Sequence, residues 1–527
     1  MMPKMDSARL RMLVALWMIS GCSDTKSQST DDTIAPTPPA DLRVTRTSLT
    51  TVALSWTAST DSGGSGLAGY DVYRDESTTE GPVAQVTAAE TSFVDSGRQF
   101  NTSYTYTIRA RDMSGNLSQP SAPLSVTTES YKKVAYFTQW GIYGRNFRIR
   151  DVDQLAQAET LTHINYAFAN INAQGRCFEA APPDGDPWAD YQARFSAEQS
   201  VDGIADAPDQ PLAGNFYQIK KLKQKHPKLR VLLSIGGWSW SKFFSNAAAP
   251  ENRAAFVASC IDLFIKGNLP ILGEPQGGAG VASGIFDGFD LDWEWPGSDG
   301  NAGNVMRPED NQNFAGLVQE FRAQLDAYGA QVGRTYDLSA FLPAAPAKIA
   351  AGFPRAIFDS LDFATVQGYD YYGAWDAQTN LQSQLVSPSE NPSPSKFSAE
   401  VALGAWHAMG APSDRLVLGI PAYGRGWANV PDVNHGLYQS GVPAPGMWEA
   451  GVDDYKVIKD KPGDTYRDQA NGALWKFDGN TFWTYDDPQL VREKAGYVKT
   501  KGLGGVMMWS LDGDDGSLVE AMTDGLP

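Results

Sequence analysis

Eight short apolar runs, alternating with helix-like patterns, constrain the fold of this chain more than any other feature of its sequence. In the stretches 215–226, 251–265 and 311–325, apolar residues recur at helical spacing. The strand candidates are 133–137, 161–168, 229–235, 284–292, 336–342, 361–367, 415–421 and 503–509. Eight strands alternating with helices over about 400 residues predict an α/β fold, the (β/α)8 or TIM barrel. A doubly wound open sheet is the alternative, and it is disfavoured because no phosphate-binding loop follows the first run.

Two connections between these runs are too long for a single helix. Residues 169–228 are polar and rich in proline and glycine, and residues 424–500 carry many aromatic side chains. The second connection is long enough to form a small subdomain before the eighth strand. Long loops at one end of a barrel build the walls of a cleft, so we expect both connections to border the site.

Residues 41–128 predict a separate all-β domain. Alternating runs at 52–56, 70–74 and 104–110 are divided by turn residues and show no helical period, which is typical of a β-sandwich. The segments LSW, GYDVYR and SYTYTIRARDMSGNLS resemble those of a fibronectin type III domain. The glycines of 64–69 match a dinucleotide-binding pattern, but a strand rather than a helix follows them, so we predict a loop there and no cofactor.

The first 22 residues resemble a bacterial lipoprotein signal peptide. Basic residues precede the apolar run 12–19, which is too short to span a bilayer, and small residues lead to Cys22. We expect export and a lipid on Cys22, followed by a linker over 23–40; an ordinary export peptide is the alternative. The mature protein would be lipid-anchored to the cell envelope or secreted, touching a membrane only through that lipid.

Charge and composition disfavour some classes of binding partner. The chain has 61 acidic against 43 basic residues and a formal net charge of −18, which disfavours nucleic acid. Its four histidines and three cysteines give no zinc pattern, so no metal is predicted. Cys177 and Cys260 could pair, or Cys260 could be a small buried side chain of a helix, and the sequence leaves this open. We expect a monomer.

The most informative segment is the acidic strand at 287–294, DGFDLDWE. Because side chains alternate along a strand, Asp290, Asp292 and Glu294 share one face, which we expect to be the barrel interior. The apolar alternates Phe289, Leu291 and Trp293 point the other way. Neighbouring buried carboxylates cannot all ionise cheaply, so at least one should keep a proton, as a general acid requires. Asp287 lies off this face and is predicted to have a structural role.

This segment resembles the D-x-x-D-x-D-x-E signature of glycoside hydrolase family 18, the chitinases. Further similar segments are SIGG at 234–237, GYDYYG at 368–373, YGRGW at 423–427 and GGVMMWSLDGDD at 504–515. The resemblance covers 131–527, and it implies that the insertion before strand eight is the α+β subdomain of one branch of the family. One departure is Gln367, where many relatives carry methionine.

The resemblance implies roles for four residues. Glu294 would protonate the glycosidic oxygen and later activate water, while the N-acetyl group of the substrate attacks its own anomeric carbon. Asp292 would orient that amide, and Asp290 would hold the proton that it shares with Asp292. Tyr369 would donate a hydrogen bond to the acetamido oxygen.

The resemblance and the aromatic pattern also imply a substrate-binding set. Trp509 would form the floor under the reacting sugar. The other candidates are Asp370, Trp238, Trp295, Tyr136, Phe168, Arg425 and Trp375.

These residues predict a chitinase that hydrolyses β-1,4-linked N-acetylglucosamine polymers, with chitin and its oligosaccharides as partners. An endo-β-N-acetylglucosaminidase acting on glycan cores would need the same acid and amide chemistry. A non-catalytic chitin-binding lectin is the third alternative. It is disfavoured because such lectins have usually lost the acid, and Glu294 is present.

Overall fold

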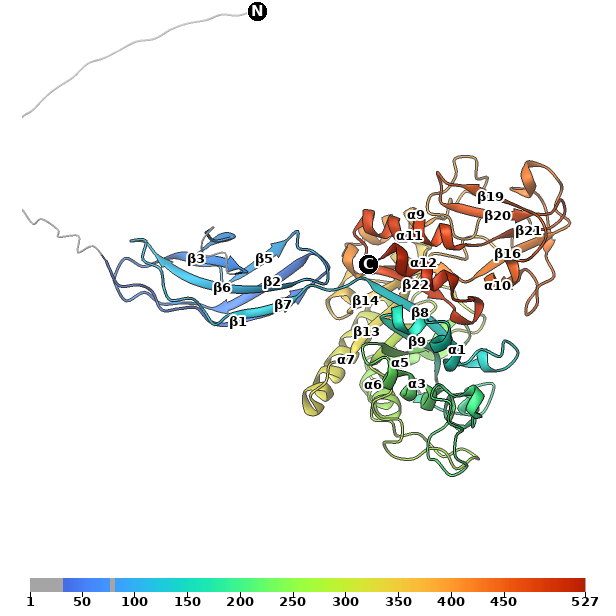
Figure 1. Cartoon of the computed structure of the whole chain (residues 1–527), viewed down its shortest axis with the longest axis horizontal. Coiled ribbons are helices and arrows are strands. Elements are labelled where there is room, and N and C mark those ends of the chain that lie inside the picture. The colour runs from blue at the N-terminus through green and yellow to red at the C-terminus, as the bar shows by residue number, and fades with distance from the viewer. Residues whose placement is uncertain (1–31, 76–80, 527) are drawn as a thin grey trace, which may run out of the picture. The chain divides into compact units, whose positions relative to one another are not determined.

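The structure is a computed structural model that describes residues 32–75 and 81–526. The chain forms two compact units, one ending at Thr128 and the other beginning at Glu129 (Figure 1). The predicted signal peptide and Cys22 lie outside the described residues, so the lipid anchor stays a prediction. Over the part of the chain that is described, no helix combines the length and apolar character that a membrane crossing needs.

The N-terminal unit is a sandwich of two antiparallel sheets, as predicted. One sheet has the order β1-β2-β5 and the other β4-β3-β6-β7. Their bounds are β1 Ala40–Thr47, β2 Thr51–Thr57, β3 Leu67–Arg74, β4 Ala84–Thr87, β5 Ser92–Ser96, β6 Ser103–Asp112 and β7 Leu124–Thr127. Alternate residues of β2, β3 and β6 fill the core between the sheets, including Trp56, Tyr70 and Tyr106. The segment 64–69, predicted to be a loop, is one only over its first half, because Leu67–Gly69 already belong to β3, the strand expected to follow it.

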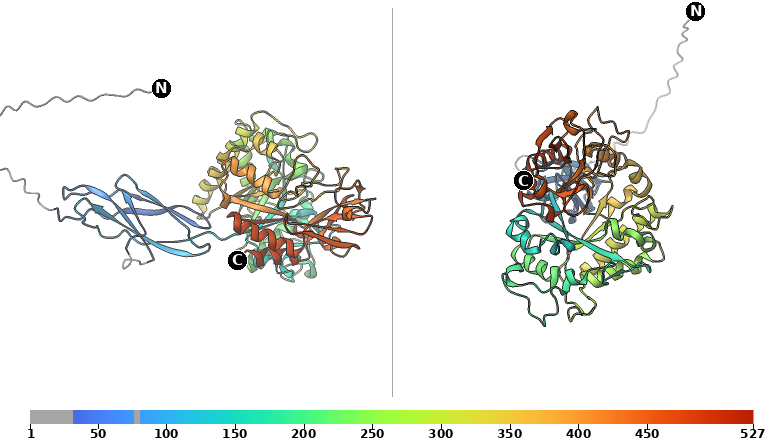
Figure 2. Two further views of the ribbon diagram at one scale, coloured as in Figure 1. Left: turned by 90° about the horizontal axis from the view of Figure 1, so that it is seen from above. Right: turned by 90° about the vertical axis from the view of Figure 1, so that its right-hand side faces the viewer.

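Eight parallel strands of the second unit close into a barrel, which confirms the predicted (β/α)8 fold. Their order around the barrel is β8-β9-β11-β12-β13-β14-β15-β22, and β22 and β9 both pair with β8. Their bounds are β8 Lys132–Thr138, β9 His163–Ile171, β11 Arg230–Gly236, β12 Gly288–Asp292, β13 Asp337–Leu342, β14 Phe363–Val366, β15 Leu416–Pro421 and β22 Gly505–Trp509. Helices surround this ring of strands (Figure 2).

The longer helices include the three that apolar periodicity indicated, over 215–226, 251–265 and 311–325. These longer helices are α3 Gly214–Lys225, α6 Arg253–Cys260, α7 Asp310–Val332, α9 Ala399–Ala408, α11 Pro488–Lys501 and α12 Ser517–Gly525. The predicted helix over 251–265 is α6 followed by a π-helical turn at Ile261–Ile265. α7 runs past its predicted end to Gly333, whose φ of 68° is the left-handed conformation in which glycine ends helices. Trp293 and Trp406 are fully buried in the barrel core.

The connection between β15 and β22 forms an α+β insertion, as the resemblance implied. A six-stranded antiparallel sheet has the order β17-β16-β21-β20-β19, with β18 also paired to β16. The elements are β16 Tyr423–Ala428, β17 Val442–Pro443, β18 Val452–Asp454, α10 Tyr455–Ile458, β19 Asp464–Asp468, β20 Ala473–Phe477 and β21 Phe482–Thr484. The sheet ends at Thr484, and the last residues of the predicted range belong to α11, whose apolar face lies in the barrel core.

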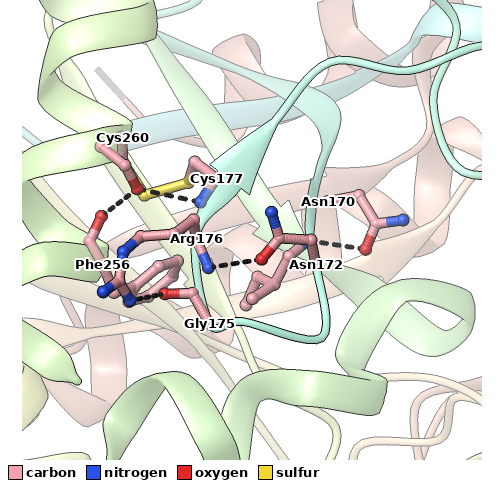
Figure 3. The surroundings of a disulfide bond; sticks show 9 residues. Asn170, Asn172, Gly175, Arg176, Cys177, Phe256 and Cys260 are labelled. Carbon is pink, nitrogen blue, oxygen red and sulfur yellow. Dashed lines mark hydrogen bonds between the residues drawn. A yellow bond between two sulfur atoms is a disulfide. The ribbon is translucent and has the colours of Figure 1, made fainter. Parts of the chain in front are cut away.

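Cys177 and Cys260 form a disulfide, which settles the open question about them. Cys177 lies in the short strand β10 (Cys177–Phe178), paired with β9, and Cys260 ends α6 (Figure 3). The N–H of Cys177 also donates to the hydroxyl of Ser259 at 3.0 Å. The bond therefore ties the start of the long connection after β9 to a helix on the outside of the barrel.

Candidate active site

The carboxyl end of β12 opens into a cavity of about 1220 Å³. Asp292 ends the strand, and Glu294 lies two residues beyond it, with both side chains lining the cavity. The Ser241 hydroxyl accepts from the N–H of Glu294 at 2.8 Å, and the Asn304 side chain donates to the Glu294 carbonyl at 2.9 Å. These contacts fix the backbone that carries the acid.

Asp290 lies below the cavity, fully buried in the barrel, and is surrounded by hydroxyl groups. Tyr136 and Ser234 donate to its Oδ2 at 2.7 and 2.8 Å, and Ser339 donates to its Oδ1 at 2.6 Å. Burial raises the pKa of Asp290, and these three hydrogen bonds oppose that shift. The hydroxyls come from β8, β11 and β13, so Asp290 is held from three other strands.

Asp292 and Glu294 keep their protons more strongly than isolated carboxyls do. Burial, together with the charges of Glu294 and Asp290, raises the pKa of Asp292 well above its ordinary value. Burial, and then the charge of Asp370, raises the pKa of Glu294 to about 8. A carboxyl that holds its proton near neutral pH while facing a cavity can act as a general acid.

Tyr369 and Asp370 reach the cavity from the end of β14. Burial raises the pKa of Tyr369 far above its ordinary value, so its hydroxyl remains a donor. Asp370 accepts a hydrogen bond from Nε of Arg425 at 2.8 Å. The Arg425 guanidinium also lies 4.8 Å from the ring centre of Trp375 and 5.3 Å from that of Tyr423. This cluster joins the barrel to β16 of the insertion.

Aromatic rings cover the bottom of the cavity. The Trp509 ring stacks on Phe168 with 5.7 Å between centres and tilts against Tyr136 at 5.1 Å. The rings come from the carboxyl-terminal halves of three neighbouring strands, β22, β8 and β9, and Trp509 is the last residue of β22. Flat faces of this kind suit the apolar faces of sugar rings.

The three remaining predicted tryptophans differ in exposure. Trp238 is 51% exposed and Trp375 is 60% exposed, so both present open faces at the cavity wall. Trp295 is only 6% exposed and stacks on Phe341 with 5.7 Å between ring centres. Its ring is therefore part of the cavity wall and has little open surface.

All the predicted site residues within the described chain therefore meet at one place, with Asp290 beneath the cavity and the others on its surface. Ser234 and Ser339 had no predicted role in the site. Both lie on the inward face of their strands, and strand parity with a polar residue at an expected core position could have found them. Further lining residues not predicted for the site are Gln139, Trp140, Asp186, Trp240, Lys348, Tyr423 and Glu449.

The predicted role of Asp287 stays a structural one in this geometry. Its carboxylate accepts from Lys223 Nζ at 2.6 Å, Arg334 at 3.1 Å and the N–H of Val231 at 2.9 Å. It lies at the amino end of β12, away from the cavity-lining residues.

Among the described residues, one carboxylate group has metal-ligand spacing, and it lies in the N-terminal sandwich. Asp32, Asp61 and Asp112 each place an oxygen within 4.8 Å of the others. Backbone N–H groups already donate to each of them, for example Gly66 to Asp61 at 2.7 Å and Asn116 to Asp112 at 2.8 Å.

Comparison with known proteins gives consistent matches for both units. The family model described as glycosyl hydrolases family 18 matches residues 132–514, and that of the fibronectin type III domain matches residues 37–127. Chitinase C of Streptomyces lividans is 35% identical over 496 residues, with 91% of this chain and 73% of that protein covered. Chitinase 63 of Streptomyces plicatus is 35% identical over 511 residues, covering 93% and 77%. The catalytic domain of a psychrophilic chitinase B from Arthrobacter TAD20 matches with a TM-score of 0.72 at 48% identity, over 75% of this chain and 95% of that chain.

Proposed function

The chain belongs to glycosyl hydrolase family 18, and we propose that it is a chitinase that cleaves β-1,4-linked N-acetylglucosamine polymers with Glu294 as the general acid and base. The observation that carries the proposal is the column of Asp290, Asp292 and Glu294, which rises from the barrel core into an aromatic-floored cavity. This column is rare in a barrel interior, which apolar side chains normally fill.

In the first step, Glu294 donates its proton to the glycosidic oxygen as the bond from that oxygen to the anomeric carbon breaks. The carbonyl oxygen of the acetamido group on the same sugar forms a bond to the anomeric carbon, giving a cyclic oxazolinium ion. The raised pKa of Glu294 supports this role, because the proton is present at neutral pH.

In the second step, Glu294 is a carboxylate and takes a proton from water as that water attacks the anomeric carbon. The ring of the oxazolinium ion opens, and the sugar keeps its original anomeric configuration. The water approaches from the face that the leaving sugar has vacated.

Asp292 and Tyr369 would hold the acetamido group during both steps. Asp292 faces the amide N–H and stabilises the positive charge that develops there, while the Tyr369 hydroxyl donates to the amide oxygen. In the free protein the raised pKa of Asp292 keeps the proton shared by the two aspartates on it. Asp292 can balance the developing charge only as a carboxylate, so during these steps we assign that proton to Asp290, as the resemblance implies.

Export of the protein remains part of the proposal. The disulfide between Cys177 and Cys260 supports it, because such bonds persist mainly in oxidising compartments. Attachment through a lipid on Cys22 would be tested by labelled fatty acid, which a Cys22→Ala protein should fail to incorporate.

The test of the main proposal is the hydrolysis of N-acetylglucosamine oligomers by the purified protein and by its Glu294→Gln variant. We expect the wild type to release short products, the variant to lose nearly all activity, and an exposed control, Glu274→Gln, to keep it. Binding without cleavage by the wild type would contradict the proposal and favour a lectin. Cleavage restricted to glycan cores would favour the endo-β-N-acetylglucosaminidase alternative.

A further inference from the structure

One wall of the cavity is formed by the loop between β10 and the π-helical turn Trp188–Gln192. The cavity-lining residues of this loop are Pro182, Pro183, Gly185 and Asp186. Glu179 begins the loop directly after β10, and Asp190 lies in the turn that ends it. These two acids flank the wall in the chain without lining the cavity, and neither takes part in the proposed reaction.

Asp190 joins the end of this loop to the barrel through a buried chain of hydrogen bonds. The Tyr166 hydroxyl, from β9, donates to Oδ1 of Asp190, and Nδ2 of Asn215, from α3, donates to the Tyr166 oxygen at 3.1 Å. All three side chains are buried. The carboxyl of Asp190 is therefore held by a strand of the barrel and by a helix that covers it.

The middle of the loop is held by contacts nearer the surface. The Tyr143 hydroxyl donates to the two carboxylate oxygens of Asp186 at 3.0 and 2.9 Å, in an exposed position. The Asn170 side chain donates to the Asp184 carbonyl at 2.8 Å. Because water competes for exposed contacts of this kind, the buried end at Asp190 matters more for the position of the wall.

Glu179 and Asp190 are acids that keep their protons at neutral pH. Burial, and then the charge of Asp186, raises the pKa of Glu179 to about 8. Burial, and then the charge of Glu179, raises the pKa of Asp190 well above its ordinary value. Ionising either group would therefore place a buried charge beside other acids of the same loop.

The other titratable groups that face these acids are tyrosines. Tyr166 faces Asp190 from β9, Tyr143 faces Asp186 from the connection after β8, and Tyr191 shares the π-helical turn with Asp190. Burial raises the pKa of each tyrosine, so the hydroxyls stay neutral while the acids titrate. Along the described part of the chain, no lysine, arginine or histidine forms an ion pair with the three acids, so no cation balances their ionisation.

The raised pKa of Glu179 makes the hold on the wall depend on pH. If the wall moved outward, water would reach Glu179 and its pKa would return towards the ordinary value of 4.5. Between 4.5 and about 8, the wall in place therefore binds more protons than the displaced wall, and rising pH favours displacement. Above this range Glu179 would be a charge beside Asp186 without a cation, which is costly when buried.

We propose that Glu179 and Asp190 are positioning residues that hold this wall of the cavity in place while they are uncharged, and that their ionisation at alkaline pH displaces the wall and weakens the binding of the polysaccharide. The inference rests on the proposed function, because the ligand is the same. It concerns the strength of binding, whereas Glu294 governs the chemical step.

Amide variants test the inference, because an amide resembles a carboxyl that cannot lose its proton. Glu179→Gln and Asp190→Asn are each made in a Glu294→Gln parent, in which the proposed acid can neither cleave the ligand nor titrate. Asp184→Asn in the same parent is the matched control, since Asp184 is an exposed acid of the same loop.

Two measurements are made on each protein at pH 6 and pH 9. Calorimetry gives the Kd for a long N-acetylglucosamine oligomer. Hydrogen exchange of the loop amides, corrected for the intrinsic effect of pH, gives the protection of the wall without any ligand.

We expect the Kd of the parent to rise between pH 6 and pH 9 by roughly three- to tenfold more than the Kd of either amide variant. The Asp184→Asn control should follow the parent. The loop amides should lose protection over this range in the parent and the control, and keep it in both amide variants. Because the expected result is tighter binding by the variants at pH 9, a variant that merely folds badly cannot produce it.

Equal pH dependence of Kd in the parent and both amide variants would overturn the inference, and so would loop protection in the parent that does not change with pH. A purely structural role of the two acids would change Kd by the same factor at both pH values. Failure of the parent to bind the oligomer at pH 6 would contradict the proposed function instead, and the exchange measurement separates the two cases because it needs no ligand.

Discussion

The two ends of β12 carry buried acidic groups that are neutralised in different ways. At the amino end, Asp287 is paired with the cations Lys223 and Arg334. At the carboxyl end, Asp292 and Glu294 have no ion pair among the described residues, and protons neutralise them instead, as their raised pKa values indicate. The cations that neutralise Asp287 are side chains and cannot leave, whereas the protons on Asp292 and Glu294 can be transferred to a substrate.

The same contrast separates Asp337 on the next strand from the cavity acids. Burial raises its pKa, but the hydrogen bond from His163 and the charge of Arg230 outweigh burial and hold the pKa of Asp337 at about 2. Two neighbouring strands, β12 and β13, thus carry both carboxylates that serve stability and carboxyls that we assign to chemistry. The partners of each group set the direction of its pKa shift, since burial raises the pKa of Asp337 as it does that of Asp292 and Glu294.

The largest expected effect is on activity. Asp292→Asn should lower kcat by about 10²- to 10³-fold, because a neutral amide cannot balance the positive charge that develops on the acetamido group. Asp287→Asn should leave kcat within about twofold, since its partners lie away from the cavity. Steady-state kinetics on N-acetylglucosamine oligomers would measure both. Similar losses of kcat in the two variants would contradict the proposed difference between the two ends of β12.

The second effect is on stability and reverses the order of the two variants. Asp287→Asn leaves Lys223 and Arg334 without their carboxylate, which should lower the free energy of unfolding by about 3 kcal/mol. Asp292→Asn removes a buried, crowded carboxyl and should change the free energy of unfolding by less than about 1 kcal/mol. Urea denaturation followed by fluorescence gives both values. A stability loss confined to Asp292→Asn would contradict the structural role that we assign to Asp287.

The third effect is the pH dependence of stability. Folding raises the pKa of Glu294 from 4.5 to about 8, so between these values the folded state binds more protons than the unfolded state and stability falls as pH rises. In Glu294→Gln this loss is absent, and its melting temperature relative to the wild type should rise from pH 5 to pH 8. For Asp337, whose pKa is lowered, the stabilisation is present above pH 4 and is lost as pH falls towards 2. Calorimetry across pH would test both signs, and a constant difference between Glu294→Gln and the wild type would exclude the raised pKa.

The smallest effect is on the basic limb of the activity profile. The charge of Asp370 raises the pKa of Glu294 and that of Lys348 lowers it. Asp370→Asn should therefore move the basic limb of kcat/KM to lower pH, and Lys348→Met should move it to higher pH, each by less than about one pH unit. Shifts in the same direction for the two variants would show that another group controls this limb.

The barrel and most of the site could be predicted because both follow from strand periodicity. Apolar runs marked the eight strands, and alternation along 287–294 placed Asp290 and Asp292 inside the barrel and Asp287 off that face. Glu294 lies beyond the strand end, so its position depends on the loop that Ser241 and Asn304 hold. The α+β insertion was found through resemblance and length, since its short strands carry little periodicity.

The remaining features depend on contacts between residues distant in sequence. The pairing of Cys177 with Cys260 spans 83 residues and requires β10 and α6 to meet. The hydroxyl groups around Asp290 come from three strands, and no local pattern links them to it. The cis peptide bonds before Phe168, Trp295 and Ser510 also had no sequence signal, because cis bonds outside proline are too rare to be expected.

The most direct test of the account is a titration of the Glu294 carboxyl itself. Protein labelled with ¹³C at the side-chain carboxyl of glutamate would be followed by NMR from pH 4 to pH 9, and the Glu294→Gln spectrum would identify the signal by difference. We expect a midpoint near 8, with the proton present at neutral pH. A midpoint near the ordinary glutamate value of about 4.3 would contradict it, because the proposed acid would then be ionised before the substrate arrives.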